Sequence, residues 1–367
     1  MSNEVLLTPG QVIKPILTQE NAIEIVEKLY GLRVSKITEL NAYDDKNYHI
    51  IGNKQEFNNP YINEVSQDGY VLKIINSLDS KKTLMIEAQT ELLLFLNKKG
   101  ISCPLPVKCI SGSYFSLQKI NPETEEEHAV RLLVYLPGEI LTNVPKTNEL
   151  MLNVGKYVAT LERILKEFSH PVYDEHQTIW MLNSVPKLRE FLYVLENEEE
   201  KRIVSEVIAL FEEKVLAIMD RFAKGIIHGD LNERNIVMSP DEKTVGSVID
   251  FGDSHHSCVI FDLIIALCYM MMQSEDLESG KFVIRGYQTV RHLVDDEKSI
   301  IKVSVCARLC QSLVLGLYSY KTDPSNEYTL TTQKSGWKLL KKLWLISDEE
   351  IASIWDLMSV DNGHEKE

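Results

Sequence analysis

The chain has 367 residues, of which 44% are hydrophobic and 25% are charged. This is an ordinary globular composition, with enough residues for two lobes that each bury a core. Lys and Arg total 39 against 54 Asp and Glu, which gives a formal net charge of −15. A surface of this sign repels phosphate backbones and anionic membranes, so neither a nucleic-acid partner nor a membrane partner is expected.

The cysteines and the apolar runs bear on the compartment. Six cysteines are scattered without a CxxC pair or a zinc-like spacing, which indicates reduced thiols and a cytoplasmic location. The segment MSNEVLLTPG lacks the basic stretch and apolar run of a secretory signal. The apolar run Leu263–Met272 is too short to span a bilayer and predicts a buried helix. The oligomeric state is not predicted.

The first third of the chain predicts one helix followed mainly by strands. Residues 18–30 form an amphipathic helical pattern, with Thr18 as a cap and Gly31 as a stop. A second helix is expected over 83–97, and the polar stretch 52–68 is interpreted as an exposed hairpin insertion. Strands are expected at 34–40, 48–51, 70–75, near 104–106, and at 130–136.

Helical patterns dominate after Pro137-Gly138. They are found around residues 148–168, 185–217, 258–273, 287–318 and 334–358. The order predicts an α+β fold with an antiparallel sheet lobe over residues 1–136, which carries one main helix, and a mostly helical lobe over residues 137–367.

One compact unit carries the chemistry. The segments HGDLNERN (228–235) and IDFGD (249–253) flank two short apolar strands, near 236–238 and 247–249, that are expected to pair as a hairpin. Asp230 and Asn235 precede the first strand, and Asp250 follows the second. Antiparallel pairing would bring these three side chains to one edge.

Phosphoryl transfer needs this set of groups. One carboxylate orients the attacking hydroxyl and accepts its proton, and hard oxygen ligands hold Mg²⁺ against the phosphates. The spacing from Asp230 to Asn235 matches the kinase catalytic loop, and Asp250-Phe251-Gly252 matches the metal-binding element that follows it. We therefore expect Asp230 as the catalytic base and Asn235 and Asp250 as metal ligands.

The first lobe supplies the expected phosphate-binding group. Lys73 lies in a strand, where kinases place the lysine that contacts the phosphates. Glu87, on the following helix, is expected to hold Lys73 by an ion pair, and Glu91, one turn further along, is the alternative.

Other polar residues near the motif receive separate interpretations. His228 is expected to brace the backbone rather than act as the base. Asp262 is expected to cap a helix or anchor a loop. Asp253 is expected to contact a substrate ammonium group. His255 and His256 are expected in a solvent-facing loop rather than in a metal site.

The form HGDLNERN, with Gly where protein kinases have Arg, and the segment IDFGD resemble the aminoglycoside phosphotransferase family. Within it, the chain resembles the hydroxylysine kinases at residues 40–50, 130–139, 179–186, 228–237, 249–272, 306–319 and 335–340. The resemblance implies a bilobal kinase-like fold and Mg²⁺-dependent transfer from GTP to the hydroxyl of 5-hydroxy-L-lysine. It also implies that Lys73 contacts the nucleotide and that the hinge around Val134, Tyr135 and Leu136 contacts the base.

The chain departs from protein kinases in the loop over residues 41–47, which contains no glycine. Asp44 and Asp45 would repel a triphosphate if they pointed at it. Either the loop's N–H groups and Asn47 meet the phosphates, or the carboxylates face elsewhere, for example toward substrate amines.

Three questions stay open from the sequence. Because the hinge reads the base through backbone groups, the residues do not choose between GTP and ATP. The acceptor could be another amino alcohol, such as choline, ethanolamine, homoserine or an aminoglycoside. A non-catalytic pseudokinase is a further alternative, although Lys73, Asp230, Asn235 and Asp250 are all present.

Overall fold

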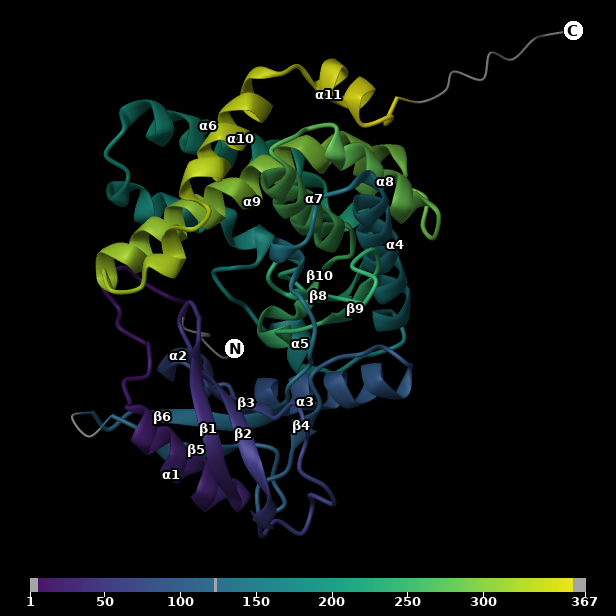
Figure 1. Cartoon of the computed structure of the whole chain (residues 1–367). Helices are drawn as coiled ribbons and strands as arrows, with labels where there is room; N and C mark the ends of the chain where they lie inside the picture. The colour runs from purple at the N-terminus through teal and green to yellow at the C-terminus, as the bar shows by residue number, and fades with distance from the viewer. Residues whose placement is uncertain (1–5, 122–123, 359–367) are drawn as a thin grey trace, which may run out of the picture.

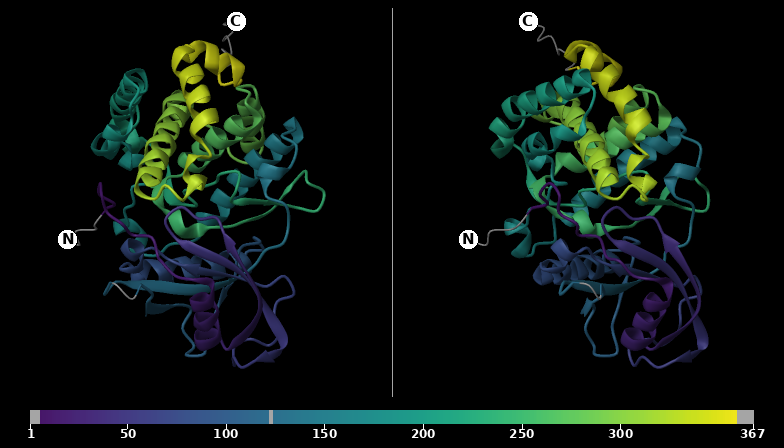
Figure 2. Two further views of the ribbon diagram at one scale, coloured as in Figure 1. Left: turned by 60° about the vertical axis from the view of Figure 1, so that its left-hand side comes forward. Right: turned by 90° about the vertical axis from the view of Figure 1, so that its left-hand side faces the viewer.

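The computed structural model describes residues 6–121 and 124–358. A sheet occupies one end of the molecule and a helical part the other, as Figure 1 and Figure 2 show. Six strands pair in the order β1-β2-β3-β6-β4, with β5 also paired to β6, and all of these pairs are antiparallel. Their bounds are β1 Leu32–Leu40, β2 Lys46–Phe57, β3 Tyr70–Ile74, β4 Pro106–Val107, β5 Ser116–Lys119 and β6 Glu127–Val134. The predicted α+β class is confirmed.

Helix α1 (Gln19–Tyr30) begins and ends where the sequence predicts. The backbone N–H of Asn21 donates to Thr18 Oγ1 at 3.2 Å, and Gly31 ends the helix at φ 60°. At this φ a side chain would be strained, so glycine is the residue that suits the stop. The buried face of α1 belongs to the core of the sheet.

The prediction of an exposed hairpin insertion over 52–68 is wrong. Strand β2 continues to Phe57, and Ile62 and Val65 are 9% and 2% exposed within the core of the sheet. The many Asn and Gln residues of this stretch suggested an insertion, although two apolar residues among them pack into the core. A polar stretch can therefore line the solvent side of a segment that still contributes to a core.

Helices α2 (Ser77–Ser80) and α3 (Thr83–Lys98) connect the two parts of the molecule. In Figure 1, α3 runs between the sheet and the helices above it. Its buried residues Met85, Ala88, Leu92 and Leu96 belong to the hydrophobic cluster of the helical part rather than to that of the sheet. The division at residue 136 remains a prediction, because the larger core extends across it.

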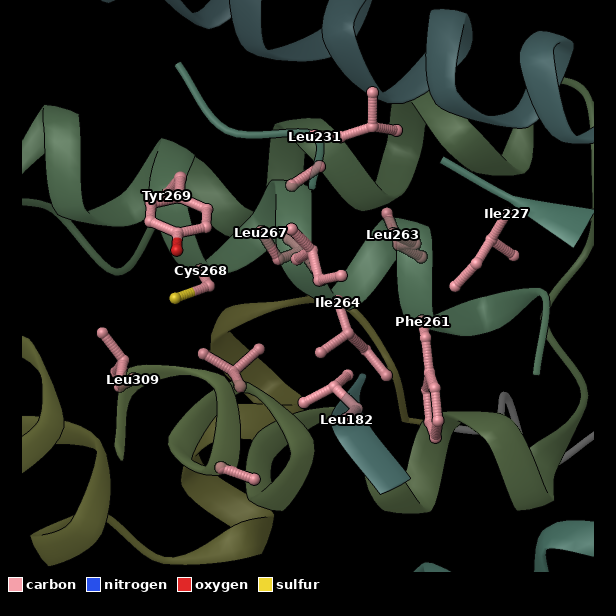
Figure 3. Packing of buried hydrophobic residues seen from close by; sticks show 14 of the residues in the cluster. Leu182, Ile227, Leu231, Phe261, Leu263, Ile264, Leu267, Cys268, Tyr269 and Leu309 are labelled. Carbon is pink, nitrogen blue, oxygen red and sulfur yellow. The ribbon is translucent and has the colours of Figure 1, made fainter. Parts of the chain in front are cut away.

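The helical part packs around α7. It comprises α4 Asn148–Leu165, α5 Val172–Glu175, α6 Glu198–Lys214, α7 Ile260–Ser274, α8 Ser279–Gln288, α9 Asp295–Thr322, α10 Gln333–Leu345 and α11 Asp348–Ile354. Short 3₁₀ turns lie at η1 Leu141–Asn143, η2 Leu182–Val194, η3 Leu216–Arg221, η4 Phe251–Asp253 and η5 Glu327–Leu330. Every residue from Ile260 to Met272 is buried, and Figure 3 shows Leu263, Ile264 and Leu267 within this packing. The prediction of a buried helix over Leu263–Met272 is confirmed.

The helical pattern predicted over 185–217 is interrupted in the structure. The 3₁₀ segment η2 contains Pro186, which has no N–H for a regular α-helical ladder. Helix α6 then starts after Asn197, whose side chain accepts hydrogen bonds from the backbone N–H groups of Glu199 and Glu200.

Within the described ranges, α9 alone is long and apolar enough to match a membrane-spanning helix by length and composition. Its apolar window is 89% buried inside the protein, as is usual for a core helix, so the match is weak.

Two small strand pairs lie at the site. Strands β8 (Ile236–Met238) and β9 (Val245–Val248) form the predicted antiparallel hairpin. Strands β7 (Lys224–Ile227) and β10 (His255–Cys258) also pair. His255 and His256 therefore lie in a strand, and the expectation of a solvent-facing loop is wrong. The ring Nδ1 of His255 contacts the carbonyl of Asp253 at 2.7 Å, and the residue is 1% exposed.

Candidate active site

The loop over residues 228–235 is anchored from helix α7. The carboxylate of Asp262 accepts the backbone N–H of His228 at 2.8 Å and that of Gly229 at 2.9 Å. Gly229 adopts φ +83°, and a Cβ there would lie 2.4 Å from the carbonyl oxygen of Asp253. The loop thus requires glycine at this position, and Asp262 is the expected loop anchor.

His228 braces the same loop. Its Nδ1 accepts the backbone N–H of Asp230 at 3.2 Å, and its Nε2 lies 3.1 Å from the carbonyl oxygen of Ile249. A ring protonated at Nε2 satisfies both contacts. Both nitrogens are therefore committed to the backbone, which supports a structural role.

The carboxylate of Asp230 is held from three sides. It accepts hydrogen bonds from Asn232 Nδ2 at 2.7 Å, from Asn235 Nδ2 at 2.9 Å and from Arg308 Nη2 at 2.6 Å. The first two donors meet Oδ2 and the arginine meets Oδ1. These contacts fix the orientation of the carboxylate before any substrate binds.

Arg308 is a buried residue of this site that the sequence did not predict. Its side chain is 2% exposed on helix α9 and also donates to the carbonyl of Trp180 and to Gln311 Oε1. The guanidinium lies 5.5 Å from the ring of Trp180 and 5.5 Å from that of Tyr269. An arginine within an otherwise apolar helical pattern was the available signal, because a buried charge needs a partner.

The β8–β9 hairpin brings the two predicted metal ligands together. The backbone N–H of Ile249 donates to the carbonyl of Asn235 at 2.9 Å, so Asp250 follows directly beside Asn235. Because Asn235 Nδ2 is committed to Asp230, its Oδ1 is the atom left for a cation. Asp250 retains 42% of its side-chain exposure and offers Oδ2. Two hard oxygens with open space suit Mg²⁺, which takes few ligands from protein.

Lys73 pairs with two carboxylates. Its Nζ lies 2.7 Å from Asp250 Oδ1 and 3.1 Å from Asp45 Oδ2. Burial alone would lower the pKa of Lys73, but the two carboxylates outweigh burial and raise it. Partial desolvation acts to raise the pKa of Asp250, yet Lys73 holds it below the usual value. Each group of the pair is thus stabilised in its charged form.

The expected ion pair between Lys73 and Glu87 does not form. Both Glu87 and the alternative, Glu91, face solvent on α3, because the buried stripe of the helix falls on the neighbouring positions. The residue of α3 that reaches the site is Gln89, whose Nε2 donates to the carbonyl of Gly252 at 2.9 Å. Asp45 takes the place expected for the glutamate.

The glycine-free loop between β1 and β2 is fixed by side chains. Asp45 Oδ1 accepts hydrogen bonds from the backbone N–H of Asn76 at 2.9 Å and from the side-chain Nδ2 of Asn76 at 3.1 Å. Tyr43 packs edge-on against Trp180 and Tyr328, with ring centroids 5.2 Å and 6.4 Å apart. The backbone carbonyl of Tyr43 also accepts from Asn326 Nδ2 at 3.3 Å. The loop is therefore held to the helical part.

The remaining predicted residues of the sheet side lie along its strands. Asn47 faces Lys73 in the β2–β3 register, and its buried Oδ1 has no hydrogen-bond partner among the described residues. The N–H of Val134 donates to Leu105 at 2.8 Å, which leaves its carbonyl as the group that a base could contact. Leu136 follows the end of β6 and is half-buried.

Asp253 lies in η4 and belongs to the same cluster of carboxylates as Asp230 and Asp250. Burial raises its pKa, and the charges of Asp230 and Asp250 raise it further, while Arg308 opposes them. Its side chain has no ion-pair partner within residues 6–121 and 124–358. Lys73 and Arg308 are engaged by Asp250 and Asp230, so Asp253 is the carboxylate left for a cation.

Residues 47–295 match the profile of the phosphotransferase enzyme family, abbreviated APH. Hydroxylysine kinase of Xenopus laevis is 36% identical over 362 residues, which covers 93% of this chain and 94% of that protein. Hydroxylysine kinase of Bos taurus is 34% identical over 355 residues, with 93% of each chain covered.

A microcompartment-associated aminopropanol kinase has a similar solved structure. Its TM-score is 0.66 at 16% sequence identity, and the alignment covers 91% of this chain and 99% of that one. At this identity the similarity concerns the fold, and it confirms the kinase-like arrangement expected from the sequence.

Proposed function

Because the chain belongs to the phosphotransferase enzyme family, as a small-molecule kinase with an alcohol group as acceptor, we propose that it phosphorylates the side-chain hydroxyl of 5-hydroxy-L-lysine. The phosphoryl donor in this proposal is GTP, and the reaction depends on Mg²⁺. Relatives named hydroxylysine kinase that align over 93% of the chain support this acceptor. The observation that carries the proposal is the triply held carboxylate of Asp230.

In the proposed reaction, Asp230 accepts the proton of the acceptor hydroxyl. The hydroxyl oxygen forms a bond to the γ-phosphorus of GTP while the bond to the β-phosphate oxygen breaks, and GDP leaves. Arg308, Asn232 and Asn235 keep the carboxylate in one orientation. We assign Arg308 a positioning role, since its buried guanidinium acts on the substrate only through Asp230.

Lys73 is proposed to contact the phosphates of the nucleotide. Its present partners, Asp45 and Asp250, hold Nζ beside the proposed metal ligand. Asn235 and Asp250 would hold Mg²⁺, which when bound neutralises charge on the phosphate oxygens. Asn47 is a further candidate for a phosphate contact through its side-chain Nδ2 donor, because it lies opposite Lys73 in the β2–β3 register.

The base of the nucleotide is assigned to the chain segment that follows β6. The carbonyl of Val134 and the backbone of Leu136 are the proposed contacts, since the N–H of Val134 is already used within the sheet. Backbone contacts of this kind suit either purine, so the assignment of GTP relies on the resemblance to the hydroxylysine kinases.

Asp253 is proposed to bind an ammonium group of the acceptor. Its carboxylate is crowded by Asp230 and Asp250, which raise its pKa. An incoming ammonium would supply the missing positive charge and favour the ionised form. This contact would place the acceptor beside the base.

A substrate panel tests the proposal. The purified full-length chain is incubated with Mg²⁺ and either GTP or ATP, together with 5-hydroxylysine, choline, ethanolamine, homoserine or an aminoglycoside. Phosphorylated products are identified by mass. We expect 5-hydroxylysine with GTP to give the highest kcat/KM. Turnover of another acceptor without turnover of 5-hydroxylysine would remove the proposal, and no turnover with any acceptor would favour a pseudokinase.

A further inference from the structure

Arg234 lies inside the catalytic loop, between the proposed base and the proposed metal ligand. Its backbone N–H donates to Asn232 Oδ1 at 2.8 Å, and the N–H of Asn235 donates to the same oxygen at 3.1 Å. This turn fixes the backbone from which the Arg234 side chain leaves. The position of the Arg234 backbone within the catalytic loop is therefore fixed.

The guanidinium of Arg234 stacks on an aromatic ring of the helical part. Its central carbon lies 4.9 Å from the ring centroid of Tyr328 in η5. Tyr328 is packed edge-on against Tyr43, and the charges of Asp230 and Asp250 act on it. Arg234 is thus directed toward the side of the site formed by the helical part, while Lys73 belongs to the sheet.

Within residues 6–121 and 124–358, the terminal nitrogens of Arg234 donate to no acceptor. Among the described residues, its guanidinium makes no hydrogen bond, and its nearest carboxylate oxygen is Glu233 Oε1, 3.8 Å from Nε. Arg308 differs, because it donates to three acceptors and is 2% exposed, while the side chain of Arg234 is 29% exposed.

A half-buried planar cation that lies in the catalytic loop and donates to no acceptor among the described residues is suited to an anionic group. A guanidinium can donate two parallel hydrogen bonds to one carboxylate, and stacking on an aromatic ring fixes the orientation of the guanidinium plane. On the sheet side, the phosphates already have Lys73 and the metal ligands. We propose that Arg234 binds the carboxylate of the acceptor, so that the substrate class is a hydroxylated amino acid and not an amino alcohol that lacks a carboxyl group.

This inference rests on the proposed function and sharpens it. With Asp253 binding an ammonium group and Arg234 binding a carboxylate, the two residues would recognise the two charged groups of an amino acid. Acceptors such as choline and ethanolamine would satisfy the first contact and leave the second without a partner.

A substrate-and-variant cycle tests the role of Arg234. The acceptors are 5-hydroxylysine and the diamine that results from removing its carboxyl group, and the proteins are the wild type, Arg234→Gln, Arg234→Lys and the control Arg33→Gln. Arg33 lies on β1 and pairs with Glu27 on the surface. We expect Arg234→Gln to raise KM for 5-hydroxylysine by about 10- to 100-fold, the usual worth of a charge-assisted hydrogen bond. KM for the diamine and KM for GTP should stay within about twofold, and Arg234→Lys should recover part of the loss.

Three results would overturn the inference. An equal rise in KM for both acceptors would show that Arg234 does not sense the carboxylate, and a raised KM for GTP would assign it to the phosphates. If the wild type does not accept 5-hydroxylysine, the proposed function fails. The role of Arg234 is then tested separately, with homoserine and its carboxyl-free counterpart as the two acceptors in the same cycle. Phosphorylation of only carboxyl-free acceptors would remove it.

Discussion

At the scale of single residues, the site holds the carboxylates of Asp45, Asp230, Asp250 and Asp253, and Lys73 and Arg308 pair with three of them. Lys73 holds Asp250 and Arg308 holds Asp230, while Asp253 has no cationic partner in the described part of the chain. Isolated buried charge is costly, and functional sites are where such groups are retained. This unpaired carboxylate is the reason why we propose an ammonium group of the acceptor as the partner of Asp253.

Arg308 should affect turnover more than acceptor binding. We expect Arg308→Lys to lower kcat by about 10²-fold, because a small displacement of a catalytic group has a cost of that size. Lysine keeps the charge but does not reproduce the planar set of contacts to Asp230, Trp180 and Gln311. Steady-state kinetics would measure kcat and the acceptor KM, and KM should change little.

The uncharged variant Arg308→Met serves as the comparison for the positioning role. It should lose more activity than Arg308→Lys, because it leaves Asp230 without the contact to Oδ1. Nucleotide binding, measured by calorimetry, reports whether each variant is folded. If both variants bind nucleotide and retain the kcat of the wild type, Arg308 does not position the base.

The protonation of Asp44 should make the stability of the protein depend on pH. Burial, followed by the charges of Asp45 and Asp79, raises its pKa to about 7, whereas an unfolded aspartate titrates near a pKa of about 4. The folded state then binds the proton more tightly, so the wild type loses stability as pH rises between these two values. We expect Asp44→Asn to be more stable than the wild type at about pH 8, by on the order of 2 kcal/mol, and the advantage to shrink toward about pH 4. Urea unfolding at both pH values measures this, and an advantage that does not change with pH would contradict it.

At the scale of elements, helices α4 and α8 approach closely because each presents a glycine. A Cβ at Gly155 would lie 1.8 Å from the carbonyl oxygen of Val283, and one at Gly286 would lie 1.9 Å from that of Leu152. Both obstacles are backbone atoms, which cannot turn aside as a flexible side chain can. The two glycines therefore set the separation of the helices.

Gly155→Ala should destabilise the protein through this contact. We expect the free energy of unfolding to fall by about 1–3 kcal/mol, since extra volume in a packed interface forces backbone shifts. Gly225→Ala is the matched control, because the nearest atom to its added Cβ would be Val259 Cγ2 at 3.4 Å, an ordinary contact. Urea unfolding of both variants measures the difference, and equal stability of Gly155→Ala and the wild type would refute the account of the interface.

Elements with local signals could be predicted from the sequence. The cap at Thr18, the stop at Gly31 and the β8–β9 hairpin depend on residues close together in the chain, and all three are observed. The pairing of β7 with β10 was missed, because it joins strands on either side of that hairpin. Local patterns indicate an element but not its distant partner.

The same distinction applies to the site. Asp230, Asn235 and Asp250 are brought together as their motif spacing predicts. The partner of Lys73 was assigned to Glu87, but Asp45 holds it instead, since helical periodicity alone does not reveal which face of α3 meets the site. Arg308 lies 78 positions from Asp230; its place in an apolar pattern indicates that it needs a partner, but a single sequence does not show which residue that partner is.

At the scale of the whole molecule, one hydrophobic core connects the sheet side to the helical part. Helix α3 contributes to that core, and Leu7 and Ile13 of the N-terminal segment join it. The backbone N–H of Ser77 donates to the carbonyl of Ile13, and Lys14 pairs with Asp323 after α9. The N-terminal segment thus ties the sheet side to the helical part, which keeps Lys73 and Asp230 in a common frame.

We propose that Asp230 accepts the proton of the 5-hydroxylysine hydroxyl during phosphoryl transfer, and the variant Asp230→Asn isolates this role. Formation of phosphorylated 5-hydroxylysine from GTP is followed by mass for the wild type and the variant, with nucleotide binding measured in parallel. We predict that turnover falls by about 10²–10⁴-fold, the usual contribution of a positioned general base, while nucleotide binding persists. Wild-type turnover in Asp230→Asn would contradict the assignment of the base and the mechanism that depends on it.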